Sequence, residues 1–241
     1  YKRQGYTGMS IRGSDGSRIN VTINGVPLND SESHATYWVD LPDFASSISS
    51  IQIQRGVGTS TNGAGAFGGS INVSTKKQSQ APKFKLSNSF GSYGTLKNST
   101  SFSTGRVGKY FELSGNLSKI YSDGYIDRAS SNLKGYFLQG SYDKDRTNIK
   151  FIAFGGHERT YQAWYGLDQE TLSNNRKFNY AGMYFNDDGD QFFYDKQEDN
   201  YKQDHYQLIF NHLINPSWRA NLTFHYTHGR GYYEEYNEDQ N

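Results

Sequence analysis

The chain has 241 residues and a formal net charge of +1, with 34% hydrophobic and 16% aromatic residues. No run of about 18 or more apolar residues occurs, which excludes membrane crossing by helices, and the balanced charge gives no general electrostatic reason to expect a nucleic-acid partner. The chain lacks cysteine, which excludes disulfides, cysteine–zinc sites and thiol catalysis.

The first part of the chain combines many glycines with short β-branched segments. Residues 19–23, 48–53 and 70–75 are predicted to form short strands. Asn24-Gly25 predicts a tight turn directly after the first of them. The density of glycine indicates that the backbone of this part turns and packs closely.

A polar stretch at residues 76–82 separates two kinds of sequence pattern. It contains Lys, Gln, Ser and Pro and is typical of a linker. We therefore predict one domain at residues 1–78 and a second at residues 79–241.

Beyond the linker, longer segments alternate apolar and polar residues with the period of two that a β-strand requires. The apolar positions are Phe84, Leu86 and Phe90; Phe111, Leu113, Gly115 and Leu117; Tyr136, Leu138 and Tyr142; Tyr206, Leu208 and Phe210; and Ala220, Leu222, Phe224 and Tyr226. Only residues 149–154 have a mixed pattern. A transmembrane β-barrel with this alternation is compatible with the low mean hydropathy of −0.84.

The predicted connections differ in length on the two sides of this second domain. Residues 105–109, 143–147 and 215–217 make short turns, whereas residues 122–132 and 166–200 make long loops. Bacterial outer-membrane barrels have short periplasmic turns and longer extracellular loops. A soluble β-sandwich also has alternating strands, so periodicity alone leaves both architectures open.

Four segments of the first domain carry a family resemblance. Ile11-Arg12-Gly13, the run from Val21 to Leu28, the run from Gln52 to Gly56, and the glycine-rich run from Gly63 to Val73 resemble the plug of TonB-dependent receptors. The motif residues are Arg12, Gly13, Asn24, Gly25, Pro27, Arg55, Gly56, Gly65, Gly68, Gly69 and Asn72. The resemblance implies a mainly β fold, in which a plug of short mixed strands sits inside an antiparallel barrel of about 22 strands.

The resemblance covers the later plug and roughly the first third of such a barrel. Because the chain opens at Tyr1 without a signal peptide, we expect the natural N-terminus, the TonB box and the remaining barrel strands to be missing. Arginines such as Arg12 and Arg55 can bind barrel carboxylates, and a structural role is favoured for them over substrate contact. Asn24 and Gln54 stand where relatives often carry acids, which puts in doubt any plug-to-barrel ion pair that uses those acids.

The resemblance also suggests where a ligand is bound. Residues 29–39 resemble an apical plug loop that faces the substrate, and flat aromatic faces and a histidine can contact an organic ligand. The predicted ligand-binding residues are His34, Tyr37 and Trp38 in this loop, Asp15 and Arg18 in the neighbouring turn, and Tyr161 and Trp164 at the entry to the long barrel loop. Packing of the loop aromatics against the barrel wall is an equal alternative for them.

Other motifs give no enzyme or metal signature. Gly63-x-Gly65-x-x-Gly68 fits a dinucleotide fingerprint by letter but leads into a strand pattern. The acidic run at residues 186–190 lacks EF-hand spacing and is typical of a solvated loop. We therefore predict no catalytic residue, no metal site and no cofactor.

The resemblance implies active import of a scarce ligand across the outer membrane of a Gram-negative bacterium, with a siderophore or other metal chelate favoured. The implied partners are TonB with the ExbB/ExbD complex, acting through the missing N-terminus, together with outer-membrane lipid and a surface lipoprotein. Two alternatives remain open: a β-rich surface binding or adhesion module, and a fragment captured by an envelope assembly or secretion complex.

Overall fold

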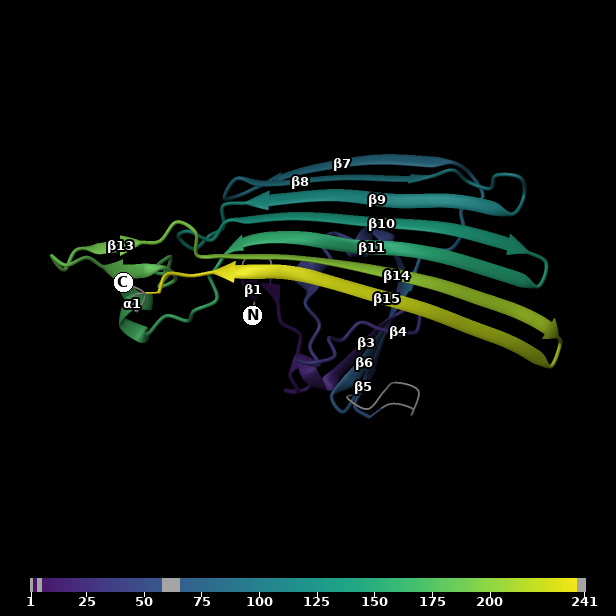
Figure 1. Cartoon of the computed structure of the whole chain (residues 1–241), viewed down its shortest axis with the longest axis horizontal. Coiled ribbons are helices and arrows are strands. Elements are labelled where there is room, and N and C mark those ends of the chain that lie inside the picture. Colours follow the sequence, from purple (N-terminus) through teal and green to yellow (C-terminus); the bar gives the residue numbers. More distant parts are fainter. Residues whose placement is uncertain (1, 4–5, 58–65, 238–241) are drawn as a thin grey trace.

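The computed structural model describes residues 2–3, 6–57 and 66–237, which form two main sheets that pack together (Figure 1). A four-stranded sheet in the order β4-β3-β6-β5 lies against one face of a seven-stranded antiparallel sheet in the order β15-β14-β11-β10-β9-β8-β7. The mainly β fold class is confirmed. In the part of the chain that the structure describes, no helix has the length and apolar character needed to cross a membrane.

The four-stranded sheet is built from the short segments that the first domain predicts. A parallel pair, β3 (Ile19–Ile23) with β6 (Gly69–Thr75), forms its centre, and β4 (Val26–Pro27) and β5 (Ile48–Arg55) flank that pair antiparallel. The remaining elements of this part are β1 (Lys2–Arg3), β2 (Tyr6–Thr7) and the 3-10 turns η1 (Gly16–Arg18), η2 (Trp38–Asp40) and η3 (Phe44–Ser47).

Several motif residues shape turns of this sheet. Asn24 and Gly25 both have positive φ, at 55° and 83°, as a tight hairpin turn between β3 and β4 requires. Gly68 lies so close to its neighbours that an added Cβ would come within 2.6 Å of the Ser14 side chain. Gly69 is equally restricted, because an added Cβ would lie 2.6 Å from the Gln54 carbonyl oxygen. These positions therefore accept only glycine without a backbone shift.

The other motif residues contribute less to close packing. Arg12 and Gly13 share a tight turn, Pro27 ends the edge strand β4, and Gly56 takes positive φ just after β5. The Asn72 side chain accepts a hydrogen bond from the Thr22 hydroxyl at 2.8 Å. Arg12 and Arg55 are exposed, and among the described residues neither forms an ion pair. Gly65 lies outside the described residues.

Long strands with short connections at one end form the seven-stranded sheet. The strands are β7 (Lys83–Gly91), β8 (Thr95–Ser103), β9 (Phe111–Ser122), β10 (Ser131–Lys144), β11 (Thr147–Tyr161), β14 (Glu198–Asn215) and β15 (Trp218–Glu234). The long loop between β11 and β14 holds α1 (Gln169–Asn174), β12 (Met183–Phe185) and β13 (Gln191–Phe193), and projects beyond the ends of the strands (Figure 1).

The two faces of the seven-stranded sheet differ in chemistry. Strand register aligns the predicted apolar positions on the face away from the four-stranded sheet, as in the cross-strand pairs Leu208–Phe224 and Gly115–Leu138. The opposite face carries polar side chains at many positions, including Glu112, Asn116, Gln139 and Gln207. Side chains of both kinds thus follow the period of two along each strand.

Where the two sheets meet, an apolar cluster interrupts this polar face. Phe44 of η3 packs against Phe137 of β10 and Phe154 of β11, with ring centroids 6.0 and 5.1 Å apart. Ile152 belongs to the same cluster and is fully buried. This contact accounts for the mixed pattern of residues 149–154, because their inward positions face another sheet rather than water.

Candidate functional site

The loop that follows β4 is held against β3 by one amide side chain. Asn29 Oδ1 accepts a hydrogen bond from the Val21 backbone N–H at 2.7 Å. Asn29 Nδ2 donates to the backbone oxygens of Ile19 and His34, both at 2.8 Å. Since Ile19 and Val21 belong to β3, this bridge fixes the start of the loop to the most buried strand of the four-stranded sheet.

A second side chain closes the tip of this loop. Asp30 Oδ1 accepts hydrogen bonds from the backbone N–H groups of Ser33, at 2.7 Å, and Glu32, at 3.1 Å, which is an Asx-type turn. The hydrogen bond from the Ser33 backbone lowers the pKa of Asp30, against a smaller opposing effect of burial. The loop tip therefore keeps a negative charge.

The loop lines a cavity of about 550 Å³, which we call the aromatic cavity. It brings together four of the predicted ligand-binding residues, Asp15, Tyr37, Trp38 and Trp164. Trp164 comes from the loop after β11, so the cavity lies between the loops around the four-stranded sheet and the long loop that follows β11. Trp38 Nε1 and Thr36 Oγ1 are buried and have no hydrogen-bond partner among the described residues. Both residues line the aromatic cavity.

The other three predicted residues lie outside this cavity. His34 is exposed and adopts a left-handed backbone conformation with φ 57°. Arg18 is exposed, and its carbonyl accepts a hydrogen bond from the Gly68 N–H at 2.9 Å. Tyr161 is buried, and its hydroxyl donates to the Tyr194 carbonyl at 2.6 Å, which fastens the long loop to the end of β11.

A second cavity, of about 440 Å³, adjoins the same loop and is strongly acidic. Tyr37 lines both cavities. We call this one the acidic cavity because its lining includes the carboxylates of Asp30, Glu32, Asp40, Glu158 and Asp199. The last two belong to β11 and β14, so the loop and the wall strands contribute charges of the same sign.

Asp40 is the most perturbed group of the acidic cavity. Its side chain is 3% exposed, and Oδ1 has no hydrogen-bond partner among the described residues. Burial, together with the charge of Asp199, raises the pKa of Asp40 to about 7. Sequence reasoning missed Asp40. An acid between Val39 and Leu41 was the available signal, because an apolar segment that contains one carboxylate places that carboxylate near the protein interior.

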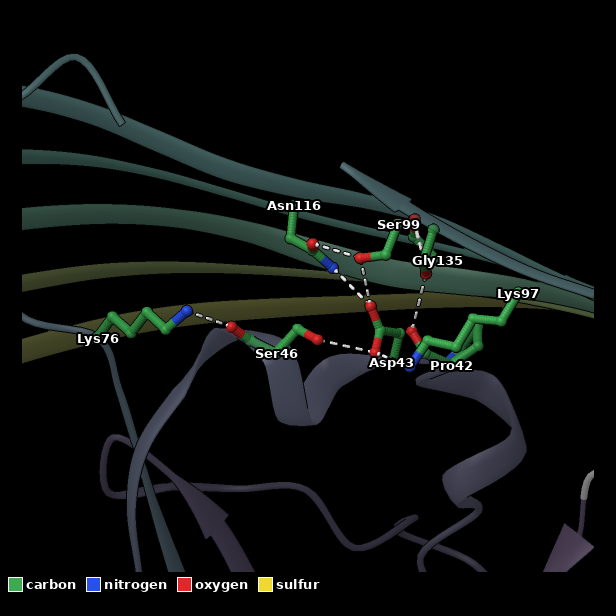
Figure 2. Close-up of polar contacts among 9 residues, drawn as sticks. Pro42, Asp43, Ser46, Lys76, Lys97, Ser99, Asn116 and Gly135 are labelled. Atoms are coloured by element: carbon green, nitrogen blue, oxygen red, sulfur yellow. Dashed lines mark hydrogen bonds and ion pairs between the residues drawn. The ribbon is translucent and has the colours of Figure 1, made fainter. Parts of the chain in front are cut away.

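Next to this site, Asp43 attaches the loop region to the seven-stranded sheet (Figure 2). Its carboxylate accepts hydrogen bonds from Lys97 Nζ (2.5 Å), Ser99 Oγ (2.7 Å), Asn116 Nδ2 (3.2 Å) and Ser46 Oγ (2.8 Å). Burial by itself would raise the pKa of Asp43, but these four donors outweigh it, and the pKa is lowered. The carboxylate is thus held in its charged form at the contact between the two sheets.

Glycines of the wall strands allow the segment before Asp43 to approach closely. A Cβ added at Gly135 would lie 2.3 Å from the Pro42 carbonyl oxygen. A Cβ added at Gly156 would lie 2.4 Å from the Asp40 carbonyl oxygen. Backbone meets backbone at these two positions, which no other residue type permits.

Asn24 supplies a further contact between the sheets. Its Oδ1 accepts a hydrogen bond from the Thr75 N–H at 3.0 Å, and its Nδ2 donates to Gln207 Oε1 at 3.3 Å. At this position the contact between the four-stranded sheet and the wall is therefore between two neutral amides.

Comparison with known protein families identifies the N-terminal part. Residues 1–70 match the family model of the TonB-dependent receptor plug domain. These residues are a TonB-dependent receptor plug domain. The four-stranded sheet with its apical loop therefore belongs to the plug, and the seven-stranded sheet is the wall against which the plug packs.

Several solved structures have the same fold, and the match extends over both the plug and the wall of this chain. The ferric-catecholate import receptor Fiu from E. coli K12, in its open form, has a TM-score of 0.70 at 15% identity, over 94% of this chain and 34% of that one. The siderophore receptor PiuA from Acinetobacter baumannii has a TM-score of 0.69 at 14% identity, over 93% and 30%. The unliganded ferric citrate transporter FecA has a TM-score of 0.69 at 14% identity, over 97% and 35%.

These similarities establish the fold, and the chain spans about a third of the length of each of these proteins. No curated protein matches the chain in sequence.

Proposed function

We propose that the chain forms the plug and the first wall strands of an outer-membrane receptor that imports a scarce ligand with energy from TonB. In this proposal residues 1–78 are the plug and residues 79–241 belong to a transmembrane β-barrel. A siderophore or another metal chelate is the first candidate ligand. The receptor binds and moves this ligand without catalysing a reaction.

The chemistry of the outer face of the wall carries this proposal. Leu117, Phe151 and Phe224 point away from the plug and are 52%, 51% and 60% exposed. In water such a broad apolar face would be unfavourable, because each large apolar side chain that stays exposed loses the roughly 1.5–3 kcal/mol of free energy that its burial would contribute. Contact with the hydrocarbon core of a membrane removes this penalty. A polar inner face around a plug is what a plugged transmembrane barrel requires.

The aromatic cavity supports a ligand site at the apex of the plug. Its volume suits a small molecule, and Trp38 and Trp164 offer flat apolar faces with one unpartnered indole N–H beside them. The solved structures of the same fold are described as receptors of ferric catecholates, siderophores and ferric citrate. Those ligands support the choice of a metal chelate as the first candidate.

The partners follow from the same proposal. TonB, driven by ExbB and ExbD, would act on the plug from the periplasmic side in a Gram-negative bacterium, and outer-membrane lipid would surround the wall. A surface lipoprotein is a further proposed partner. The Asp43 hydrogen bonds, the Asn24–Gln207 hydrogen bond and the Phe44 contact are among the interactions that pulling on the plug would have to break.

Uptake measurements test this proposal. A Gram-negative host that expresses the complete gene is supplied with iron-55 chelates of catecholate, hydroxamate and citrate type, with and without functional TonB. We expect accumulation of at least one chelate that disappears without TonB. Trp164→Ala should reduce this uptake, whereas Tyr165→Ala, an exposed neighbour that does not line the cavity, should not. Unchanged uptake of every chelate on loss of the gene would refute the proposal.

A further inference from the structure

The outer face of the wall has a gap among its large side chains at Gly140. Strand register places Gly140 of β10 between Leu113 of β9 and Phe151 of β11, which are both about half exposed. A Cβ added at Gly140 would meet no neighbouring atom within 4 Å. Gly115, a second glycine on this face, differs, because a Cβ added there would lie 2.8 Å from the Phe102 ring. A neighbouring side chain therefore covers one glycine and leaves the other open.

The gap at Gly140 is part of a cavity of about 440 Å³, which we call the outer groove. Val107, Phe111, Leu113 and Tyr142 line it with apolar surface. The rings of Phe111 and Tyr142 pack with centroids 4.9 Å apart, and two backbone hydrogen bonds, of 2.7 and 3.1 Å, hold Val107 beside Phe111. Both strands that carry the groove, β9 and β10, have hydrogen-bonded neighbours on either side. The outer groove is therefore a formed feature of the wall and not the open edge of a sheet.

The outer groove lies at the end of the wall where the connections are short, opposite the projecting long loop (Figure 1). Aromatic side chains mark this end. The Tyr110 ring lies 6.1 Å from that of Tyr142, between centroids, and Trp218, which follows another short turn, is 68% exposed. Tyr and Trp are enriched where a membrane meets water. In a membrane wall, the groove would lie just inside the headgroup level of the periplasmic leaflet.

Basic side chains gather beside the outer groove. Lys144 Nζ lies 5.3 Å from the centroid of the Tyr110 ring. Lys109 and Arg146 are exposed in the two adjoining turns, at residues 104–110 and 143–147. None of these three bases belongs to an ion pair of the described residues. Both turns are fully described, and Asp145 is the one acid in them that forms no ion pair.

The other acids near the outer groove are engaged. Asp143 pairs with Arg106 at 3.8 Å. Glu112 also lines the groove, but it is only 4% exposed. Its carboxylate accepts hydrogen bonds from the Ser79 N–H at 3.1 Å and from the Ser103 hydroxyl at 2.7 Å. Three bases against the single acid Asp145 leave the rim of the groove positively charged.

We propose that the outer groove binds one phospholipid with an anionic headgroup from the periplasmic leaflet. An acyl chain fills the gap at Gly140, and the phosphate and headgroup lie beside Lys144, Lys109 and Arg146. Long basic side chains reach the headgroup level from an apolar surface, and anionic lipids attract them there. This proposal rests on the membrane wall of the proposed function and goes beyond it, because it requires neither TonB nor an imported ligand.

Native mass spectrometry of the purified complete receptor in detergent, titrated with phosphatidylglycerol, tests the headgroup contact. Phosphatidylethanolamine, which has no net charge, and lipid A, which carries phosphates but lies in the other leaflet, are the comparison probes. We expect one retained phosphatidylglycerol, bound at least about fivefold more tightly than either comparison lipid. Lys144→Gln should weaken this binding about fivefold, and Lys144→Arg should preserve it. Lys119→Gln removes a base near the opposite end of β9 and should leave it unchanged.

A second pair of variants tests the acyl-chain contact. Gly140→Phe fills the outer groove with a ring and should abolish retention of the lipid, whereas Leu117→Phe puts the same ring on this face outside the groove and should not. Gly140→Phe is expected to fold because its side chain enters open space, and protease resistance of the plug checks this.

Several outcomes would overturn the proposal. They are equal binding of phosphatidylglycerol and phosphatidylethanolamine, tighter binding of lipid A, or full phosphatidylglycerol affinity in both Gly140→Phe and Lys144→Gln. TonB-dependent uptake by a receptor that retains no phosphatidylglycerol would refute this proposal alone. Loss of the gene without any change in uptake, for a receptor that does retain phosphatidylglycerol, would refute the import function alone.

Discussion

Asp43 of the plug and Lys97 of β8 form an ion pair of 2.5 Å whose two ends have unequal environments. The carboxylate side chain is 2% exposed, whereas the lysine side chain is 38% exposed. Three further donors also converge on the carboxylate, from Ser46, Ser99 and Asn116. The carboxylate therefore organises the contact between plug and wall, and the ammonium is one of several groups that it holds.

Removal of the two ends of this ion pair should have unequal effects. Asp43→Ala leaves buried donors unpaired, which costs about 1–3 kcal/mol, and places alanine at φ 57°, which adds about 1–2 kcal/mol. Asparagine tolerates this left-handed backbone conformation, so Asp43→Asn shows the effect of the lost carboxylate without the backbone strain. Lys97→Ala should cost at most about 1 kcal/mol. Denaturant unfolding and protease release of the plug measure the difference, and equal losses for Asp43→Asn and Lys97→Ala would contradict this account.

Asp40 predicts a pH dependence of plug docking. A carboxyl whose pKa is raised to about 7 binds its proton more tightly in the folded state, so folding stability falls as pH rises from about 4 through 7. The other carboxylates that line the same cavity are Asp199 and Glu158 on the wall and Asp30 and Glu32 on the plug loop. Asp40→Asn should therefore stabilise the plug at pH 8 and have little effect near pH 4. Thermal unfolding at both pH values checks this, and a stabilisation independent of pH would contradict it.

Because glycines of the wall lie directly against the plug backbone, we expect a single added methyl group to displace the plug. Gly135→Ala places Cβ against the Pro42 carbonyl and should destabilise docking by about 1–3 kcal/mol through overpacking. Gly140→Ala, on the same strand, is the matched control, because its Cβ would meet nothing within 4 Å. Limited proteolysis of the two variants compares them. Equal protease resistance would show that the plug does not approach β10 as closely as the structure describes.

The wall was largely predictable from the sequence because its pattern is local. Alternation along each strand placed positions such as Leu113, Leu138 and Leu208 on one face, and the register of the seven strands confirms this. The inward apolar residues could not be predicted in the same way. Ile152 and Phe154 are buried by Phe44, which lies more than a hundred residues earlier, and period-2 reasoning has no access to such a contact.

The candidate site was predictable only where its residues came from one loop or from the family resemblance. Tyr37 and Trp38 are adjacent in the chain, and Trp164 lines the same cavity from the wall. The acidic cavity joins Asp40 to Asp199 across 159 residues of sequence (199 − 40), and although the apolar neighbours of Asp40 mark it as buried, nothing in the sequence pairs it with Asp199. Charge that accumulates between separate elements becomes visible only once the plug is packed against the wall.

The exposed apolar face of the wall predicts where a charge would be tolerated least. Leu117 of β9 points away from the plug, and in a bilayer an arginine at such a position costs about 2–4 kcal/mol near the midplane. Leu117→Arg should therefore lower the yield of the receptor inserted into lipid vesicles, whereas Leu117→Ile should insert as the wild type does. In detergent micelles, where the arginine can reach water, the loss of stability should be smaller. Equal insertion of the Arg and Ile variants would show that this face does not contact hydrocarbon, and would count against the membrane wall as proposed.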